Sequence, residues 1–259
     1  MDEAFLNHWV ARARAAEPAA IAVLLRGSHA RGEAGPHSDL DLTVLTSEPP
    51  LTRYRAELVE TEEGRLLHVS VGALSWANWL AERNVPAEWS FSLPTRQAAR
   101  VLWVAAAYEA ALADPLVLQP PGPPNLEDFV EAAAKVKNAF VAGDELALRL
   151  AAQDLAGWAP SLLRPLNPPV IVGSHAAALR VVLEFPVVPP SYCPDMLACL
   201  GLSGQAISAE ELHERALRLA VGIIDLLAPH VEELADQLEP DLPRYPRDGR
   251  LRRYLRQGI

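Results

Sequence analysis

The pattern of apolar and polar positions predicts a mixed α/β unit in the first 120 residues. The expected helices occupy residues 3–16, 74–82 and 95–112. The expected strands occupy residues 21–25, 39–45 and 66–71. The first strand is a short apolar run that ends at Gly27, which is typical of a buried strand. The second alternates apolar and polar residues, as a strand with one buried face does.

The stretch QPPGPPN at 119–125 predicts a domain boundary, because four prolines and a glycine cannot hold a helix or a central strand. Beyond it the pattern is helical. The expected helices occupy residues 126–141, 145–163, 175–185 and 208–238. Ser208 and Glu211 have the spacing of a capping box. We therefore expect two domains, at residues 1–120 and 125–259, the second a helical bundle that ends in a basic surface tail.

The net charge of −10 argues against a general nucleic-acid binder, which needs Lys and Arg for phosphate contacts. It is compatible with a cationic substrate, although an ordinary acidic surface explains it equally well. The chain has no apolar run of about eighteen residues that would span a membrane, nor a signal-peptide pattern, so we expect a cytoplasmic protein. Cys193 and Cys199 are too few for a disulfide framework.

Asp39 and Asp41 stand two residues apart in a predicted strand, so both side chains point to the same side. Two close carboxylates repel each other unless a cation lies between them, and Mg²⁺ binds one or two carboxylates together with phosphate oxygens. Upstream, Gly27 would let phosphate approach the backbone, Ser28 would add a hydroxyl donor, and Arg31 is a further phosphate contact. This layout suits phosphoryl or nucleotidyl transfer. The alternative is a solvent-facing strand that begins in a simple turn.

The segment RGSHARGEAGPHSDLDL, residues 26–42, resembles the signature of the nucleotidyltransferase superfamily whose core is shared with DNA polymerase beta. Its Gly-Pro, one residue and then Ser-Asp is similar to the aminoglycoside nucleotidyltransferases of the kanamycin type. Three later stretches resemble that family in the same order: AEWSFSLPTR at 87–96, VEAAAKVKN at 130–138 and SGQAISAEEL at 203–212. The resemblance implies a nucleotidyltransferase domain at 1–120, with a mixed sheet, followed by the helical domain.

The resemblance also implies roles for individual residues. The nucleotide would contact Gly27, Ser28, Arg31, Ser38 and Lys135, while Asp39 and Asp41 would bind Mg²⁺. Glu131 matches the general base, and the acceptor pocket would include Glu60, Glu127 and Asp128. The expected reaction transfers AMP from Mg·ATP to a hydroxyl of a small cationic acceptor, most simply an aminoglycoside. The family also implies a homodimer in which Glu131 acts on the aspartates of the partner.

Spacing alone puts Glu127, Glu131 and Lys135 on one face of a helix, because they recur every four residues. That face could bind ammonium groups, and Glu131 could serve as a base. The alternative is a solvated surface stabilised by an ordinary Glu–Lys pair.

His68 departs from the family pattern, which has a carboxylate at this position of a later strand; its same-face neighbour Ser70 is not an acid either. Three interpretations remain open. His68 could bind a softer ion or a phosphate, two aspartates could suffice with ATP oxygens while His68 lines the site, or catalysis could be impaired. The rival functions are therefore transfer to another acceptor and a non-catalytic nucleotide-binding or regulatory role.

Overall fold

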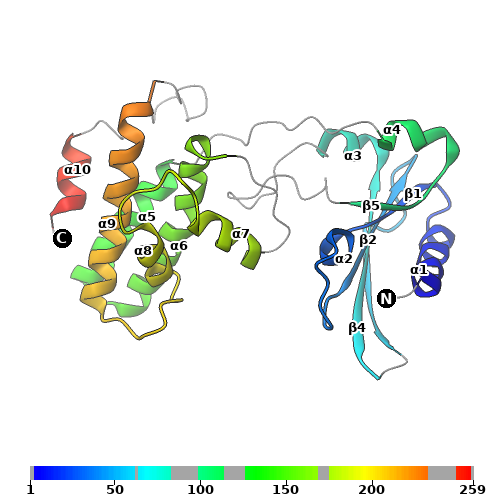
Figure 1. Cartoon of the computed structure of the whole chain (residues 1–259), viewed down its shortest axis with the longest axis horizontal. Coiled ribbons are helices and arrows are strands. Elements are labelled where there is room, and N and C mark those ends of the chain that lie inside the picture. The colour runs from blue at the N-terminus through cyan, green and yellow to red at the C-terminus, as the bar shows by residue number, and fades with distance from the viewer. Residues whose placement is uncertain are drawn as a thin grey trace. The chain divides into compact units, whose positions relative to one another are not determined.

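The computed structural model describes residues 3–61, 64–82, 99–113, 126–168, 175–232 and 249–257. The chain divides into two compact units, of which the first holds the strands and the second is helical (Figure 1). The proline-rich stretch 119–125, where the boundary was predicted, lies outside the described residues, and so does the motif at 87–96.

The first unit contains a mixed five-stranded sheet in the order β3-β4-β2-β1-β5. Its strands are β1 (Ala20–Leu25), β2 (Leu40–Thr46), β3 (Tyr54–Glu60), β4 (Leu66–Ser75) and β5 (Arg100–Val104). Its helices are α1 (Glu3–Ala16), α2 (Gly27–Arg31), α3 (Trp76–Glu82) and α4 (Glu109–Ala113), with a 3₁₀ turn at Ala106–Tyr108. β2 and β4 are parallel, and the other neighbouring strands are antiparallel. The α/β fold class is thus confirmed.

The two faces of this sheet have different surroundings. Helix α1 packs on one face of the sheet through its buried residues Trp9, Val10 and Ala13. The apolar residues of β2, which alternate with polar ones, point to this same face. On the other face Trp79 of α3 packs with Leu24 and a few neighbours into a smaller cluster. This second face also carries the polar residues at the start of β2, because odd-numbered positions of that strand point towards it.

Three differences from the sequence expectations concern the edges of this unit. The helix predicted at 95–112 is wrong, because residues 100–104 form β5 and pair with β1; residues 95–98 lie outside the described part. β-branched and aromatic residues at 101–104 favour a strand over the helix that the neighbouring alanines suggest. β3, which is mostly exposed at the edge of the sheet, was not predicted. The helix expected at 74–82 begins only at Trp76, because β4 continues to Ser75.

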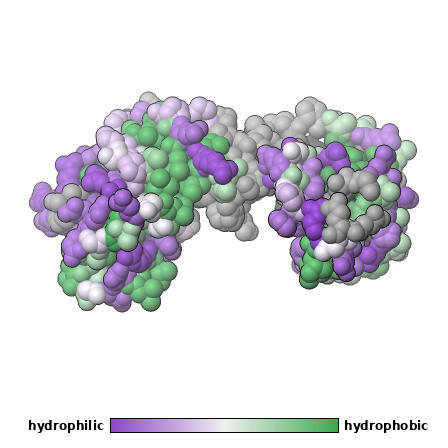
Figure 2. Space-filling view, turned by 60° about the horizontal axis from the view of Figure 1, so that its bottom comes forward, coloured by the Kyte–Doolittle hydropathy of each residue, from purple (hydrophilic) through white to green (hydrophobic). Residues whose placement is uncertain are grey.

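The second unit is a bundle of helices around one apolar core. Its helices are α5 (Leu126–Val141), α6 (Glu145–Leu163), α7 (His175–Leu183), α8 (Tyr192–Cys199), α9 (Ala209–Leu227) and α10 (Gly249–Arg256), with 3₁₀ turns at Arg164–Leu166 and Ala228–His230. The core is built from small and large apolar residues of α5, α6 and α9, including Phe129, Leu155 and Ile223. Figure 2 shows that apolar and polar residues share the visible surface of this unit.

The helical predictions hold for α5, α6, α7 and the start of α9, where Ser208 Oγ accepts a hydrogen bond from the Glu211 amide at 3.2 Å. The helix expected to reach residue 238 ends at Leu227, just before a 3₁₀ turn that contains Pro229; residues 233–248 lie outside the described part. The basic tail contains α10, whose Leu255 is buried rather than exposed. Cys193 is exposed, Cys199 is buried, and both are free thiols. Among the described helices, none is long and apolar enough to cross a membrane.

Candidate functional site

Asp41 is held by the neighbouring strand. In the parallel pair of β2 with β4, Asp41 lies directly beside Ser70. The Ser70 hydroxyl donates a hydrogen bond of 2.6 Å to Asp41 Oδ1, and only 8% of Ser70 is exposed. A short bond to a charged acceptor from a buried donor fixes the carboxylate more firmly than a solvent contact would. One oxygen of Asp41 is therefore engaged by the fold itself.

The second oxygen of Asp41 lies against Gly27. This glycine has a φ of +63°, a backbone region that other residues rarely adopt. A Cβ atom at Gly27 would lie 2.5 Å from Asp41 Oδ2, so only glycine fits this contact. The Arg26 amide also donates a 2.8 Å hydrogen bond to the Asp41 carbonyl oxygen. The turn after β1 and the start of β2 thus form one rigid corner, and α2 begins at that corner.

Asp39 lies just before β2, on the same face as Asp41 and one step nearer the open end of the sheet. Its Oδ2 atom is 4.0 Å from Nδ1 of His68, the residue that precedes the Leu40–Val69 pair on β4. Both side chains are about half exposed, at 55% for Asp39 and 44% for His68. The structure therefore brings together Asp39, Asp41, His68 and Ser70 on one sheet face.

The remaining predicted nucleotide contacts of this unit lie in the loop between β1 and β2. Ser28 stands in the first turn of α2, while Arg31 ends this helix. The Arg31 side chain is only 12% exposed and its Nε atom makes a 2.8 Å ion pair with Glu33. Ser38 Oγ accepts a 2.9 Å hydrogen bond from the Gly35 amide and so closes the turn before Asp39. To bind a nucleotide phosphate, Arg31 would have to break its ion pair with Glu33.

Glu60 lies at the end of β3, opposite Leu66 of β4. Residues paired across strands share a face, so Glu60 is on the same side of the sheet as His68 and diagonal to it. Leu58, which is directly opposite His68, is 67% exposed. The structure thus places Glu60 near the rim of the aspartate face, with an exposed apolar residue beside it.

In the helical unit, α5 carries the other predicted residues. Glu127, Glu131 and Lys135 are exposed on one face, whereas Phe129 and Val136 are buried on the opposite one. Lys135 Nζ is 3.1 Å from Glu131 Oε1, in the i,i+4 pair that the spacing predicts. This exposed pair is equally compatible with a base and with ordinary helix stabilisation. Asp128 lies beside this face and is partly buried.

Comparison with known families gives this arrangement a context. Residues 11–83 match the family model described as a nucleotidyltransferase domain. The chain contains a nucleotidyltransferase domain. Residues 125–228 match a second model, described as the substrate-binding domain of nucleotidyltransferases. The aspartates, Gly27 and His68 lie within the nucleotidyltransferase domain, and Glu127, Asp128, Glu131 and Lys135 within the substrate-binding match.

The comparison with solved structures gives a match of low sequence identity. A nucleotidyltransferase-like protein from Exiguobacterium sibiricum 255-15 is 14% identical, with a TM-score of 0.42, over 90% of this chain and 76% of the other. The comparison with curated proteins gives no match.

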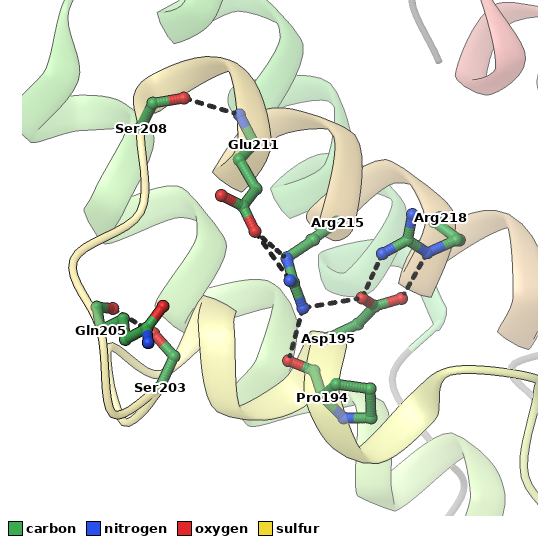
Figure 3. Close-up of polar contacts among 8 residues, drawn as sticks. All are labelled: Pro194, Asp195, Ser203, Gln205, Ser208, Glu211, Arg215 and Arg218. Atoms are coloured by element: carbon green, nitrogen blue, oxygen red, sulfur yellow. Dashed lines mark hydrogen bonds and ion pairs between the residues drawn. The ribbon is translucent and has the colours of Figure 1, made fainter.

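The stretch 203–212, which resembles the family's third later motif, supports the fold of the helical unit (Figure 3). Ser203 Oγ donates to the Gln205 carbonyl oxygen at 3.0 Å, and Ser208 caps α9. Further along α9, Arg218 forms a bidentate ion pair with Asp195 of α8. The Asp195 side chain is completely buried. Hydrogen bonding to Asp195 raises the pKa of the Arg218 guanidinium. These contacts fasten α8 to α9.

The hydrogen bond of Ser70 to Asp41 is the feature of the site that the sequence did not predict. Alternation along β4 gives the face of Ser70 but not its partner on a strand 29 positions earlier. Within the described ranges, no three His, Cys, Asp or Glu side chains are arranged to hold a metal ion. The candidate metal ligands remain Asp39 and Asp41, and His68 lies 4.0 Å from Asp39.

Proposed function

We propose that this protein transfers AMP from ATP to a hydroxyl group of a small cationic acceptor, most simply an aminoglycoside. The observation that carries the reaction class is the pair Asp39 and Asp41, of which Asp41 lies against Gly27, within the part that matches a nucleotidyltransferase domain. The acceptor class is supported by the second family match, whose model comes from the aminoglycoside nucleotidyltransferases. The exposed acids of α5 suit such a polycation.

The two aspartates fit a divalent cation such as Mg²⁺. Ser70 bonds only one oxygen of Asp41, which leaves Oδ2 for a cation, and Asp39 shares the same sheet face. Oxygen ligands of this kind suit Mg²⁺, which completes its shell with water and phosphate oxygens. When bound, the ion would screen both carboxylates and withdraw charge from the phosphate oxygens.

The protein's own groups would hold the nucleotide around this corner. Gly27 lets a phosphate approach the backbone, with Ser28 as a donor in the first turn of α2. Ser38 keeps the turn before Asp39 closed, and Arg31 would bind phosphate once it leaves Glu33. We assign Lys135 to the triphosphate as well. These roles follow the family resemblance of each residue.

Glu131 is our candidate for the base that takes the proton from the attacking hydroxyl. Lys135, 3.1 Å away, would orient its carboxylate. Glu127, Asp128 and Glu60 would bind ammonium groups of the acceptor, and His68 would line the site. We further propose that the active enzyme is a homodimer in which Glu131 serves the aspartates of the partner.

The experiment incubates the protein with Mg·ATP and kanamycin and follows both pyrophosphate release and the mass of the drug. A mass gain of one AMP, lost in Asp39→Asn while the circular dichroism spectrum is unchanged, supports the proposal. Pyrophosphate release only with other acceptors in a panel of alcohols would move the assignment to another substrate. ATP binding without pyrophosphate release from any acceptor would favour the non-catalytic role that His68, in place of a carboxylate, suggests.

Glu131 can be tested separately in the same assay. Glu131→Gln should lower kcat by at least about tenfold and change KM little, because a general base accepts the proton in the transition state and contributes little to substrate binding. Glu145→Gln is the matched control, since Glu145 forms the same i,i+4 ion pair with Arg149 on α6 at 2.6 Å. Equal rates in the two variants would remove Glu131 as the base.

A further inference from the structure

The outer edge of β3 is an exposed strand edge. β3 is the last strand of the sheet, and no strand of the described part pairs with its outer side. Tyr54 and Leu58, both on the face of the aspartates, are 60% and 67% exposed. Long apolar edge strands invite pairing with another chain, and proteins usually cover or blunt them.

The hydrogen bonds at both ends of β3 show which backbone groups are directed outwards. The Ala73 amide donates to the Arg53 carbonyl at 2.9 Å, and the Thr61 amide donates to the Arg65 carbonyl at 2.8 Å. Odd-numbered residues of β3 therefore face β4, because the direction alternates along an antiparallel strand. It follows that the amides and carbonyls of Tyr54, Ala56 and Leu58 point to the open edge.

The sequence of β3 is complementary to itself when read antiparallel. Around Ala56 the residues are Tyr-Arg-Ala-Glu-Leu, from Tyr54 to Leu58. With Ala56 opposite Ala56 of a second copy, each Tyr54 lies opposite a Leu58 on one face. On the other face each Arg55 lies opposite a Glu57. Apolar and opposite-charge cross-strand pairs both stabilise a sheet.

We propose that a second copy of this chain pairs with β3 about a two-fold axis through Ala56, which joins two five-stranded sheets into one. Three residues of each strand direct their amides and carbonyls at the other copy, so the register satisfies backbone groups as well as side chains. Glu57, which forms a 2.8 Å ion pair with Arg12, would then lie between two arginines.

This pairing would also extend the aspartate face. Leu58 lies opposite His68, which lies beside Asp39. Tyr54 of the second copy would continue this row on the far side of Leu58. The partner would therefore place an aromatic ring at the rim of the candidate site, next to Glu60.

Sedimentation velocity over a range of concentrations tests the pairing with the full chain. We expect wild type to approach twice the monomer mass of 28.1 kDa. Leu58→Lys should weaken the dimer about tenfold, since two Tyr–Leu pairs are lost at once. Leu66→Lys is the matched control: Leu66 is 68% exposed on the same face but lies on β4. Ala56→Pro removes an outward amide without a bond to β4 and should also give monomer.

A crosslink tests the register directly. In a Cys193→Ser background, Ala56→Cys places two thiols at the axis, where hydrogen-bonded partners have Cα atoms about 5.5 Å apart, within disulfide range. Mild oxidation should give a covalent dimer, and Leu66→Cys should not. A monomeric wild type, a dimer as tight in Leu58→Lys and Ala56→Pro as in wild type, or the absence of the Ala56→Cys crosslink would each overturn the proposal.

Discussion

Replacing Gly27 by alanine places a methyl group where the Asp41 carboxylate lies. The new Cβ would be 2.5 Å from Oδ2, whereas an ordinary contact begins at 3.4 Å, so one side has to move by about 0.9 Å. Alanine at a φ of +63° also costs about 1–2 kcal/mol of backbone strain. The carboxylate cannot yield easily, because its other oxygen accepts the 2.6 Å bond from Ser70.

The two contributions can be separated by a matched variant. Gly64 has a φ of +72°, and no atom of the described residues lies within 4 Å of a Cβ built there. Gly64→Ala should therefore lower the free energy of unfolding by about 1–2 kcal/mol and leave nucleotide transfer unchanged. Gly27→Ala should lose at least as much stability and, in addition, about 100-fold in kcat/KM, as a misplacement of about 1 Å does.

Urea unfolding and the pyrophosphate assay measure these two effects on the same protein samples. Binding of Mg·ATP, followed by calorimetry, should weaken in Gly27→Ala for the same reason. If Gly27→Ala and Gly64→Ala have equal transfer rates and equal ATP affinities, Asp41 does not need its position against Gly27. The metal role of the pair would then have to be abandoned.

The remaining predictions concern the helical unit. Asp195→Ala should cost about 1–2 kcal/mol in urea unfolding, because it removes the hydrogen bonds that fasten Arg218 to α8, while the Arg218 side chain, 44% exposed, can still contact water; an unchanged stability would contradict this. Ser208→Ala should cost about 1 kcal/mol as the loss of a helix cap, and Ser203→Ala should cost less. Burial chiefly, and Lys137 secondarily, lower the pKa of His213, which stacks on Phe140. Below pH about 6.5, His213 is protonated in the unfolded chain but stays largely unprotonated in the folded one, so the free energy of unfolding should decrease as the pH drops. In His213→Phe this decrease should be smaller.

Much of the fold was accessible from the sequence where one physical signal dominated. The helix α1 has a clear apolar face, and the cap of α9 has its Ser208 and Glu211 at fixed spacing. The prediction for the region of β5 was wrong because the alanines around it suggest a helix, whereas its pairing with β1 is a tertiary contact that local sequence does not give. The sequence analysis also missed β3, although Tyr54, Ala56 and Leu58 alternate with Arg55 and Glu57; the strand is short and mostly exposed, and its position at the edge of the sheet depends on a tertiary contact with β4.

The candidate site was predictable only as far as local geometry reaches. Alternation in a strand puts Asp39 and Asp41 on one face, whatever the rest of the chain does. The contact of Gly27 with Asp41 depends on how the turn after β1 meets β2, and neither spacing nor composition gives that distance. Helical spacing likewise puts Glu127, Glu131 and Lys135 on one side of α5, but their chemical role depends on which groups lie opposite them.

Two residues of β4 that are not acids, His68 and Ser70, lie beside the aspartates. A third carboxylate on this strand would add repulsion that a bound cation has to offset. Here Ser70 instead donates a hydrogen bond to Asp41, and His68 lies 4.0 Å from Asp39. The Ser70 hydrogen bond stabilises negative charge on Asp41, so the fold itself holds this carboxylate in position before any ion binds. A strand that lacks an acid at this place therefore positions an acid of its neighbour.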